Sequence, residues 1–261
     1  MKEIMEPKRL EAKAGMQWIK KGYALSMKAP LLWIVLVAIC FVAAAGISAI
    51  PVIGEPLASL LMPVVVIGLM AGSNSLDKGD ELELAHLFSG FQKHTSHLVT
   101  LGGIALVSQY LIFGAMIMVG GATLVAILMG SQAAEPAVFQ QALAGAGAAI
   151  MIGTVMFTLL LMSMQFAPML VFFRDVAPIA AMKLSLRAFT HNVSAMFVYG
   201  MAFLLLAMLA SIPMMLGWLM LMPMVFTTMY ASFCDIFPEE KQPSSSVSES
   251  DIIDPSDPSH F

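Results

Sequence analysis

Long apolar stretches alternate with short polar breaks along the whole chain. A hydrocarbon core about 30 Å thick requires roughly 20 apolar residues per helix. Pro- and Gly-containing turns such as 51–56 separate apolar stretches that meet this length. The pattern predicts an all-α, polytopic membrane bundle of six transmembrane helices arranged as three hairpins. The predicted spans are 31–50, 57–72, a part of 98–129, a part of 142–173, 194–211 and 216–233.

A short amphipathic segment precedes each odd-numbered span. Apolar residues in these segments recur at helical spacings, which is typical of helices that lie in the membrane interface with the apolar face down. Each even-numbered span carries a proline, at Pro63, Pro168 and Pro223. We therefore interpret the chain as one unit of interfacial helix, span, turn and proline-bearing span, used three times. The predicted apolar faces are Met16, Ile19, Tyr23 and Met27; Leu84, Leu87, Phe88 and Phe91; and Ile179, Met182, Leu186 and Phe189.

The charges fall on one side of this predicted topology. All 13 Lys and Arg residues lie before the first span, after the second, after the fourth or after the sixth, and the turns within the hairpins contain none. Loops on the cytoplasmic side of a membrane retain Lys and Arg. The pattern predicts a multi-pass protein of the bacterial inner membrane with both termini in the cytoplasm.

Composition supports a membrane class and divides the chain into three parts. The chain is 59% hydrophobic and 11% charged, whereas a soluble domain has about 25% charged residues. We predict a cytoplasmic N-terminal segment with an interfacial helix at 1–29 and a six-helix transmembrane domain at 30–237. Residues 238–261 are acidic and rich in Ser and Pro, a composition typical of a disordered tail.

Candidate chemistry is sparse in the predicted spans. An ion path or proton relay usually carries an intramembrane ionisable residue, and the predicted spans contain none. We expect Gln109 and Gln165 to hydrogen-bond across helices, because an unpaired amide in hydrocarbon is costly. No Ser-His-Asp set, paired carboxylates or Gly-rich phosphate loop can be assembled. We therefore predict a protein that is not an enzyme and has no catalytic residue and no cofactor.

Sulfur and imidazole groups offer weaker alternatives. Thioether ligands favour Cu(I), and Met220 and Met224 share a helical face within a chain that has 24 Met. Flexible packing among Leu residues is the favoured interpretation of these Met residues, and small apolar packing is favoured for Cys40 and Cys234. His94 and His97 lie three residues apart, so a metal-binding or pH-sensing pair is an alternative to polar contact with the membrane interface.

Basic residues beside the amphipathic segments are candidates for lipid contact. A juxtamembrane Lys or Arg contributes about 1 kcal/mol of binding free energy at an anionic membrane surface. The predicted partner is the lipid bilayer, a membrane-protein partner remains open, and no nucleic acid is expected. The candidate lipid-headgroup contacts are Lys20, Lys21, Lys28, Lys93, Lys183 and Arg187.

Several short motifs carry a family resemblance over roughly residues 10–237. They include Pro30-x-x-Trp33, Leu61-Met62-Pro63, Phe166-Ala167-Pro168, and the runs 84–91, 182–188 and 230–237. With these motifs the chain resembles an uncharacterised family of proteobacterial six-helix inner-membrane proteins. More distantly it resembles the membrane domain found beside some glycerophosphodiester phosphodiesterases. The resemblance implies no catalytic residue, because the function of this family is unknown, and we do not expect phosphodiesterase activity, because the sequence shows no soluble phosphodiesterase domain.

The sequence leaves three functions open. The favoured one is a structural or accessory membrane component that acts through helix and lipid contacts. The alternative is a transporter or facilitator of an uncharged or lipid-like molecule. A third is a Cu(I)-interacting membrane protein that uses the Met clusters.

Overall fold

The computed structural model describes residues 6–128, 136–212 and 214–239, with side chains described for all of these except 122–128 and 136–145. Within these ranges the chain is built from helices joined by turns. The elements are α1 (Ala14–Ser26), α2 (Pro30–Ser48), α3 (Gly54–Lys78), the 3-10 helix η1 (Leu84–Phe88), α4 (Ser89–Gln92), α5 (Thr95–Leu128), α6 (Pro136–Met164), α7 (Ala167–Arg174), α8 (Pro178–His191), α9 (Val193–Ser211) and α10 (Trp218–Ile236).

Six helical stretches are long and apolar enough to cross a membrane, which confirms the predicted all-α polytopic fold. They correspond to α2, α3, most of α5, α6 together with α7, α9 and α10. The second span is longer than predicted. Helix α3 continues to Lys78, and in its last turns Ser73 and Leu76 are buried whereas Asp77 and Lys78 are exposed.

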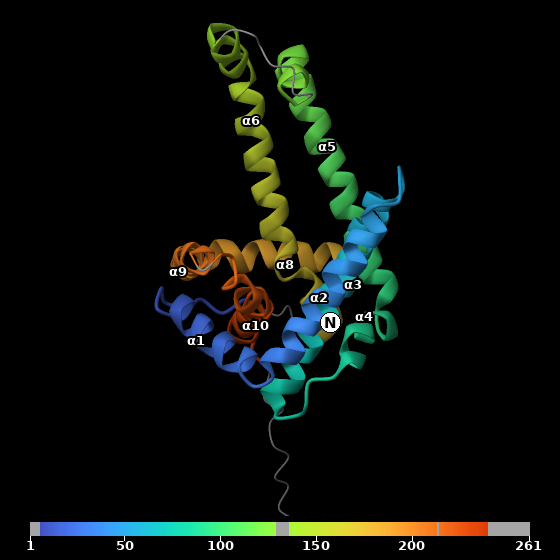
Figure 1. Cartoon of the computed structure of the whole chain (residues 1–261), viewed down its shortest axis with the longest axis vertical. Coiled ribbons are helices and arrows are strands. Elements are labelled where there is room, and N and C mark those ends of the chain that lie inside the picture. Colours follow the sequence, from blue (N-terminus) through green and yellow to red (C-terminus); the bar gives the residue numbers. More distant parts are fainter. Residues whose placement is uncertain (1–5, 129–135, 213, 240–261) are drawn as a thin grey trace, which may run out of the picture.

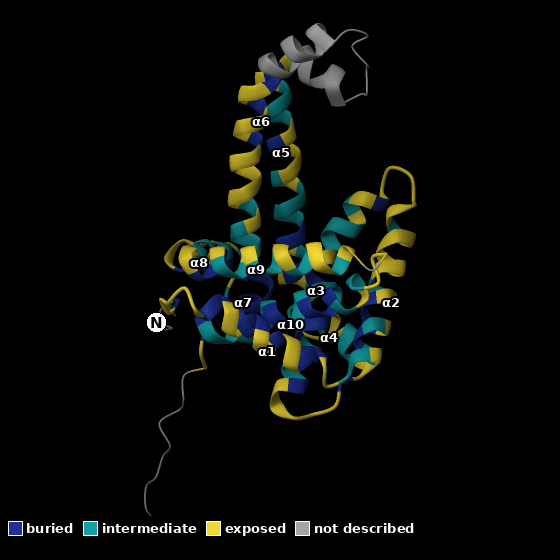
Figure 2. Cartoon of the chain, turned by 60° about the vertical axis from the view of Figure 1, so that its left-hand side comes forward, coloured by how far each residue is buried: buried dark blue, intermediate teal, exposed yellow. Residues whose placement is uncertain are grey.

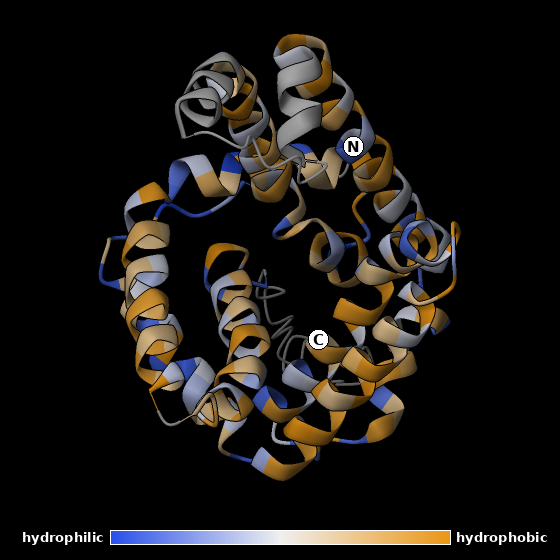
Figure 3. Cartoon of the chain, turned by 45° about the horizontal axis from the view of Figure 1, so that its top comes forward, coloured by the Kyte–Doolittle hydropathy of each residue, from blue (hydrophilic) through white to orange (hydrophobic). Residues whose placement is uncertain are grey.

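The hairpins diverge from a shared base (Figure 1). Helices α5 and α6 extend side by side from this base along the long axis of the molecule, whereas α9 lies crosswise to them (Figures 1 and 2). Buried residues concentrate at the base, exposed residues dominate α6 and α9, and α5 is mainly exposed or intermediate (Figure 2). Hydrophobic residues lie on most sides of the hairpins (Figure 3). Only 11% of the most apolar window of each of these three spans is buried, against 56% for α10.

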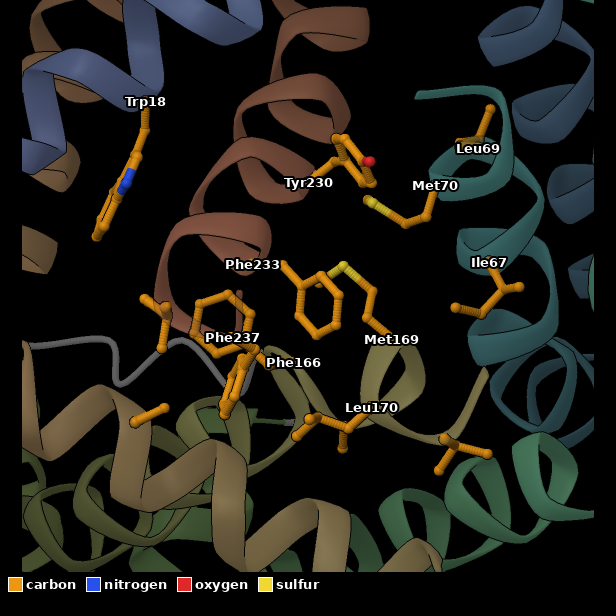
Figure 4. Close-up of a cluster of buried hydrophobic side chains, with 14 of the residues drawn as sticks. Trp18, Ile67, Leu69, Met70, Phe166, Met169, Leu170, Tyr230, Phe233 and Phe237 are labelled. Carbon is orange, nitrogen blue, oxygen red and sulfur yellow. The ribbon is translucent and has the colours of Figure 1, made fainter. Parts of the chain in front are cut away.

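The core is formed mainly by the segments that follow the three prolines. Fully buried side chains on α3 after Pro63, on α7, and on α10 after Pro223 meet between these helices (Figure 4). Phe173 on α7 contacts the rings of Tyr230 and Phe233 on α10. The segments after the prolines therefore carry much of the protein core, whereas α6, which precedes Pro168, and large parts of the odd-numbered spans face outward.

The repeat predicts that Pro168 lies within a continuous span, but the structure differs. Instead α6 ends at Met164 and α7 begins at Ala167, with Pro168 in its first turn. In the first turn of a helix the backbone N–H has no partner within the helix, so a proline at this position costs no helical hydrogen bond. The Ser185 hydroxyl on α8 accepts from the Phe166 N–H at 3.0 Å and donates to the Met162 carbonyl at 2.8 Å. These bonds satisfy two backbone groups that the break releases.

Each amphipathic segment packs on the proline-bearing span of the preceding unit. Helix α1 lies against α10, η1 and α4 lie against α3, and α8 lies against α7. The segment of the first unit, α1, packs on the proline-bearing span of the last unit, α10. The three units therefore contact one another in a closed ring. This packing relates the three units in space, in agreement with the predicted repeat.

Glycines permit two of these crossings. A Cβ on Gly22 of α1 would lie 2.7 Å from the Thr228 Cα on α10. A Cβ on Gly68 of α3 would lie 2.8 Å from the Leu87 Cα in η1. Gly68 and Gly72 of α3 lie one helical turn apart and therefore accommodate Leu87 of the connecting segment and the Leu82 side chain.

Contact of the three predicted apolar faces with the membrane interface stays a prediction, but the structure shows which side of each segment packs on protein. On α1, Ile19 is buried, but Met16, Tyr23 and Met27 are exposed, and Trp18, Gly22 and Leu25 form the buried face. The second segment is a 3-10 turn followed by one short helix instead of a continuous α-helix. On α8 the deeply buried positions are the small residues Ala181, Ser185 and Ala188. Close helix crossing selects small residues, so the most hydrophobic face is not the most buried one.

Candidate functional site

A pocket of about 320 Å³ lies where α3, α7 and α10 end. We call it the terminal pocket. Asn74 and Asp77 come from α3, Arg174 from the end of α7, and Tyr230 and Cys234 from α10. The remaining lining residues are Lys78, Phe173, Phe233, Pro238 and Glu239. The charged residues of the pocket lie at or just after the C-terminal ends of these helices, outside their apolar central parts.

The Arg174 guanidinium is held in place at one wall of the pocket. Its Nη2 donates to the Phe237 carbonyl oxygen at 2.8 Å, and its Nη1 lies 3.2 Å from the Glu239 Oε1. The guanidinium also lies 5.8 Å from the centre of the Phe233 ring. These contacts tie the end of α7 to the residues that follow α10.

The other wall is held by a hydrogen bond and an ion pair. The Tyr230 hydroxyl donates to the Asn74 Oδ1 at 3.0 Å, and the Lys21 Nζ of α1 lies 2.9 Å from the Asp77 Oδ2. Both carboxylates that line the pocket are therefore paired with cations. Cys234 has no His beside it among the ten lining residues, so the pocket holds no thiol–imidazole pair of the kind that activates a nucleophile.

Apolar side chains fill the space between the same helices next to the pocket. Ile67 and Met70 on α3 and Met169 on α7 are fully buried, and they pack together with Phe233 and Phe237 (Figure 4). The centre of the described core is therefore packed with apolar side chains.

The structure divides the six predicted lipid-contact residues into two groups. Four contact other residues of the chain: Lys21 pairs with Asp77, Lys28 donates to the Leu76 carbonyl oxygen, Lys93 lies 3.5 Å from an Asp175 oxygen, and Arg187 lies 3.1 Å from a Glu6 oxygen. Lys20 and Lys183 make no ion pair or hydrogen bond from their side chains within the described residues. Lipid contact by all six residues stays a prediction.

His94 and Asp175 join the start of α5 to the end of α7. The His94 Nε2 lies 2.5 Å from the Asp175 Oδ1, and the His97 ring stacks on His94 with the ring centres 6.0 Å apart. Desolvation acts to raise the pKa of Asp175, but the neighbouring Lys93 and His94 outweigh it and hold the pKa below its ordinary value. The predicted His pair is thus in contact, with a carboxylate as its partner.

Asp175→Asn should lower the free energy of unfolding at neutral pH by about 0.2–1 kcal/mol, the typical contribution of an exposed ion pair. Asp175 has φ 54°, a conformation that Asn also tolerates, so the substitution removes charge without straining the backbone. A carboxylate with a lowered pKa stabilises the fold above its unfolded pKa, and this contribution is lost as pH falls through the folded pKa. Thermal unfolding in detergent should show a difference from wild type that shrinks below about pH 3.8. Asp80→Asn, at an exposed carboxylate without an ion pair in the described residues, serves as the control, and an equal effect of both substitutions would contradict the prediction.

Two buried polar contacts were not predicted from the sequence. Asn192, between α8 and α9, accepts from the Leu10 N–H at 2.8 Å and donates to the Lys8 carbonyl oxygen at 3.0 Å. The Trp18 Nε1 donates to the Asp235 Oδ2 at 2.9 Å. Both contacts fix the N-terminal segment to the base of the spans. A polar residue near a helix end is visible in the sequence in both cases. The group that it bonds is more than 180 positions away, so the contact itself could not be predicted.

Other predicted polar and sulfur residues do not converge. Gln109 is exposed and Gln165 is partly buried, and neither side chain makes the expected cross-helix hydrogen bond within the described residues. Cys40 and Cys234 are free thiols. The described residues contain no group of three His, Cys, Asp or Glu side chains that could hold a metal ion. Binding of Cu(I) by Met residues stays a prediction.

Comparisons with known proteins give one informative match. The chain is 30% identical over 203 residues to a probable inner membrane protein of Burkholderia thailandensis, and the match covers 76% of this chain and 75% of that protein. No protein-family model matches the chain, and no solved structure matches it. The resemblance to the phosphodiesterase-associated membrane domain stays a prediction. Because the match extends over three quarters of both chains and six helices are suited to cross a membrane, this chain belongs to the same family of inner-membrane proteins and is a multi-pass protein of that membrane.

Proposed function

We propose that the protein is a non-enzymatic structural or accessory component of the inner membrane that acts through helix and lipid contacts. The observation that carries this proposal is the contrast between a packed base and outward-facing spans. Only 11% of the most apolar window is buried in each of three spans, those of α5, of α6 with α7, and of α9. Apolar surface of this extent requires a cover, and in a membrane the cover is lipid or a partner helix.

The α5–α6 hairpin is the strongest candidate for a partner helix. Its large apolar side chains include Leu111, Met118 and Met151, which are 65% or more exposed. Gly114 and Gly147 have no neighbouring atom within 4 Å of a built Cβ. Small residues on exposed membrane helices allow another helix to approach closely. These features support contact with a partner along the hairpin.

Transport or facilitation of an uncharged or lipid-like molecule is the competing function. It would require a path between the helices for the transported molecule. The apolar core between α3, α7 and α10 does not favour a polar path there. A route along the outer, lipid-facing side of the spans would leave this core unchanged, so the alternative needs a direct test.

The test is a lipid-exchange measurement on the purified full-length chain in liposomes. Fluorescently labelled phospholipids in both leaflets are exposed to an impermeant reductant, which quenches only the outer leaflet unless lipids cross the bilayer. We expect the same extent and rate of quenching as in protein-free liposomes. Faster and more complete quenching that scales with the amount of protein would overturn the accessory proposal in favour of a lipid facilitator.

A second measurement tests the positive content of the proposal. Purification of the chain from native membranes should recover a reproducible partner protein, and large polar substitutions on the exposed face of α5, such as Leu111→Arg, should release it. An arginine on the buried face of α5 would disrupt folding, so it could not report on contact with a partner. If the chain is recovered alone under mild conditions at every detergent concentration, the partner-helix proposal fails.

The orientation of the protein stays a prediction from the charge pattern. Reporter fusions in the 50–54 turn and after Phe261 would test it, and a signal that places both sites in the same compartment would contradict the six-span topology.

A further inference from the structure

An apolar groove of about 450 Å³ lies between α1, α9 and α10. Helix α1 packs against both α9 and α10, which also contact each other. Leu206 and Leu209 line it from α9, Met220 and Leu221 from α10, and Ile19 from α1. The volume falls within the range of about 300–1,000 Å³ that is typical of small-ligand sites.

Two side chains with polar tips are among the residues that line the groove. Lys20 and Tyr23 line it from α1. Tyr23 is 51% exposed, and a tyrosine of this kind places its ring against apolar groups while its hydroxyl stays near the membrane surface. Lys20 makes no ion pair with any described residue, in contrast to its neighbour Lys21, which pairs with Asp77 at 2.9 Å. The groove therefore combines an apolar floor with one lysine that forms no ion pair with the described part of the chain.

We propose that this groove binds one anionic phospholipid, with an acyl chain along the apolar floor and the phosphate at the Lys20 Nζ. The apolar lining excludes a polar small molecule, and the single cation matches one phosphate. A lysine at an anionic membrane surface gains binding free energy from the lipid phosphates. The Met220–Met224 face, which the sequence offered as a Cu(I) candidate, lines the same groove and provides flexible apolar contact instead. This inference rests on the proposed function, because it names a specific lipid for a protein proposed to act through lipid contacts.

The main test measures lipid binding to the delipidated full-length protein in mild detergent. Native mass spectrometry counts the phosphatidylglycerol molecules bound during a titration, and phosphatidylcholine, which has no net charge, serves as the comparison lipid. The wild type should bind a first phosphatidylglycerol more tightly than later ones and more tightly than phosphatidylcholine. Lys20→Gln should weaken the first binding step about fivefold, the effect of one lysine at an anionic surface.

Lys183→Gln is the matched control. Lys183 is also an exposed lysine on an amphipathic helix with no ion pair in the described residues, but it does not line the groove. It should leave the first binding step unchanged. Equal weakening by both substitutions would show general surface attraction and would overturn the site.

A second pair of variants tests the apolar half of the site. Leu209 and Leu205 are both 62% exposed on α9, and only Leu209 lines the groove. Leu209→Trp should fill the groove and abolish the tight first binding step, whereas Leu205→Trp should retain it. If both variants retain the tight step, no acyl chain lies in the groove and the proposal fails.

The tests separate this inference from the proposed function. Lipid exchange in liposomes by a protein that still shows the Lys20-dependent binding step would overturn the accessory function and leave the lipid site in place. Loss of the Lys20 dependence without lipid exchange would overturn the site and leave the accessory function standing. Cross-linking of a protein instead of a lipid to a Leu209→Cys variant in native membranes would show that a partner helix occupies the groove.

Discussion

Replacing Phe233 with alanine should destabilise the protein strongly, because it removes a large side chain from the centre of the core. Phe233 is 2% exposed, and its ring contacts Phe173 and Phe237 with ring centres 5.9 and 5.5 Å apart. Removal of a buried Phe side chain leaves a cavity and costs about 3–5 kcal/mol of unfolding free energy. The Arg174 guanidinium also loses the aromatic face that it covers. Since each kcal/mol shifts the melting temperature of a chain of this size by about 2–4 °C, thermal unfolding in detergent should detect the change easily.

The matched control for this prediction is Phe197→Ala. Phe197 lies on α9 and is 67% exposed, so in the membrane its ring contacts lipid or a partner and leaves no cavity when it is removed. Its effect on unfolding should be much smaller than that of Phe233→Ala. Comparable losses of stability in the two variants would mean that the segments after the prolines do not form the stabilising core.

The second large effect is expected at the crossing of α1 and α10. Gly22 allows the two helices to approach so closely that the Thr227 hydroxyl donates to the Gly22 carbonyl oxygen at 2.8 Å. A Cβ at Gly22 would lie 2.7 Å from the Thr228 Cα and would also collide with other Thr228 atoms. Gly22→Val should therefore force α1 away from α10 and cost about 1–3 kcal/mol or more, the range for overpacked contacts.

The measurement for Gly22→Val combines thermal unfolding with limited proteolysis of the N-terminal segment. Displacement of α1 should lower the melting temperature and expose residues near Lys20 and Lys21 to trypsin. Gly200→Ala on α9 is the control, because a Cβ there meets no atom within 4 Å and alanine favours the helix by about 1 kcal/mol over glycine. If Gly22→Val is as stable and as resistant as Gly200→Ala, α1 is not docked on α10 as described.

Docking of α1 also matters for the proposed lipid site. Helix α1 supplies Ile19, Lys20 and Tyr23 to the groove, so a displaced α1 would open it. Gly22→Val should then lose the tight lipid as well, although neither its charge nor its groove lining has changed. The variant thus connects a packing contact in the base with binding at the membrane-facing surface.

Much of the membrane architecture was determined by the sequence alone. The number of spans follows from the length of apolar stretches, which is a local property because each span must match the hydrocarbon thickness by itself. The short amphipathic segments were also found, and Pro63 and Pro223 lie inside helices as predicted. Bonds within one helix satisfy the backbone of each span, so these elements form largely independently of the rest of the fold.

The candidate sites were predicted less well. The sequence identified the basic residues beside the membrane, but it could not tell Lys20 from Lys21, which are adjacent in the chain. Only folding brings Asp77 to within 2.9 Å of Lys21 and leaves Lys20 at the edge of a groove. The terminal pocket was missed as well, because its residues come from three spans and from the segment after α10.

Burial within the membrane was decided by the tertiary structure. In water, an apolar side chain marks the core, but lipid and protein interiors favour the same side chains, so hydropathy does not distinguish Phe233 in the core from Phe197 on the surface. Close packing of helices depends instead on small residues and on paired polar groups such as Gly22, Ser185 and Trp18 with Asp235. These contacts join residues far apart in the chain. The sequence therefore determined which segments cross the membrane, and the tertiary structure determined which faces meet, since shape complementarity and not hydrophobicity selects the contacts.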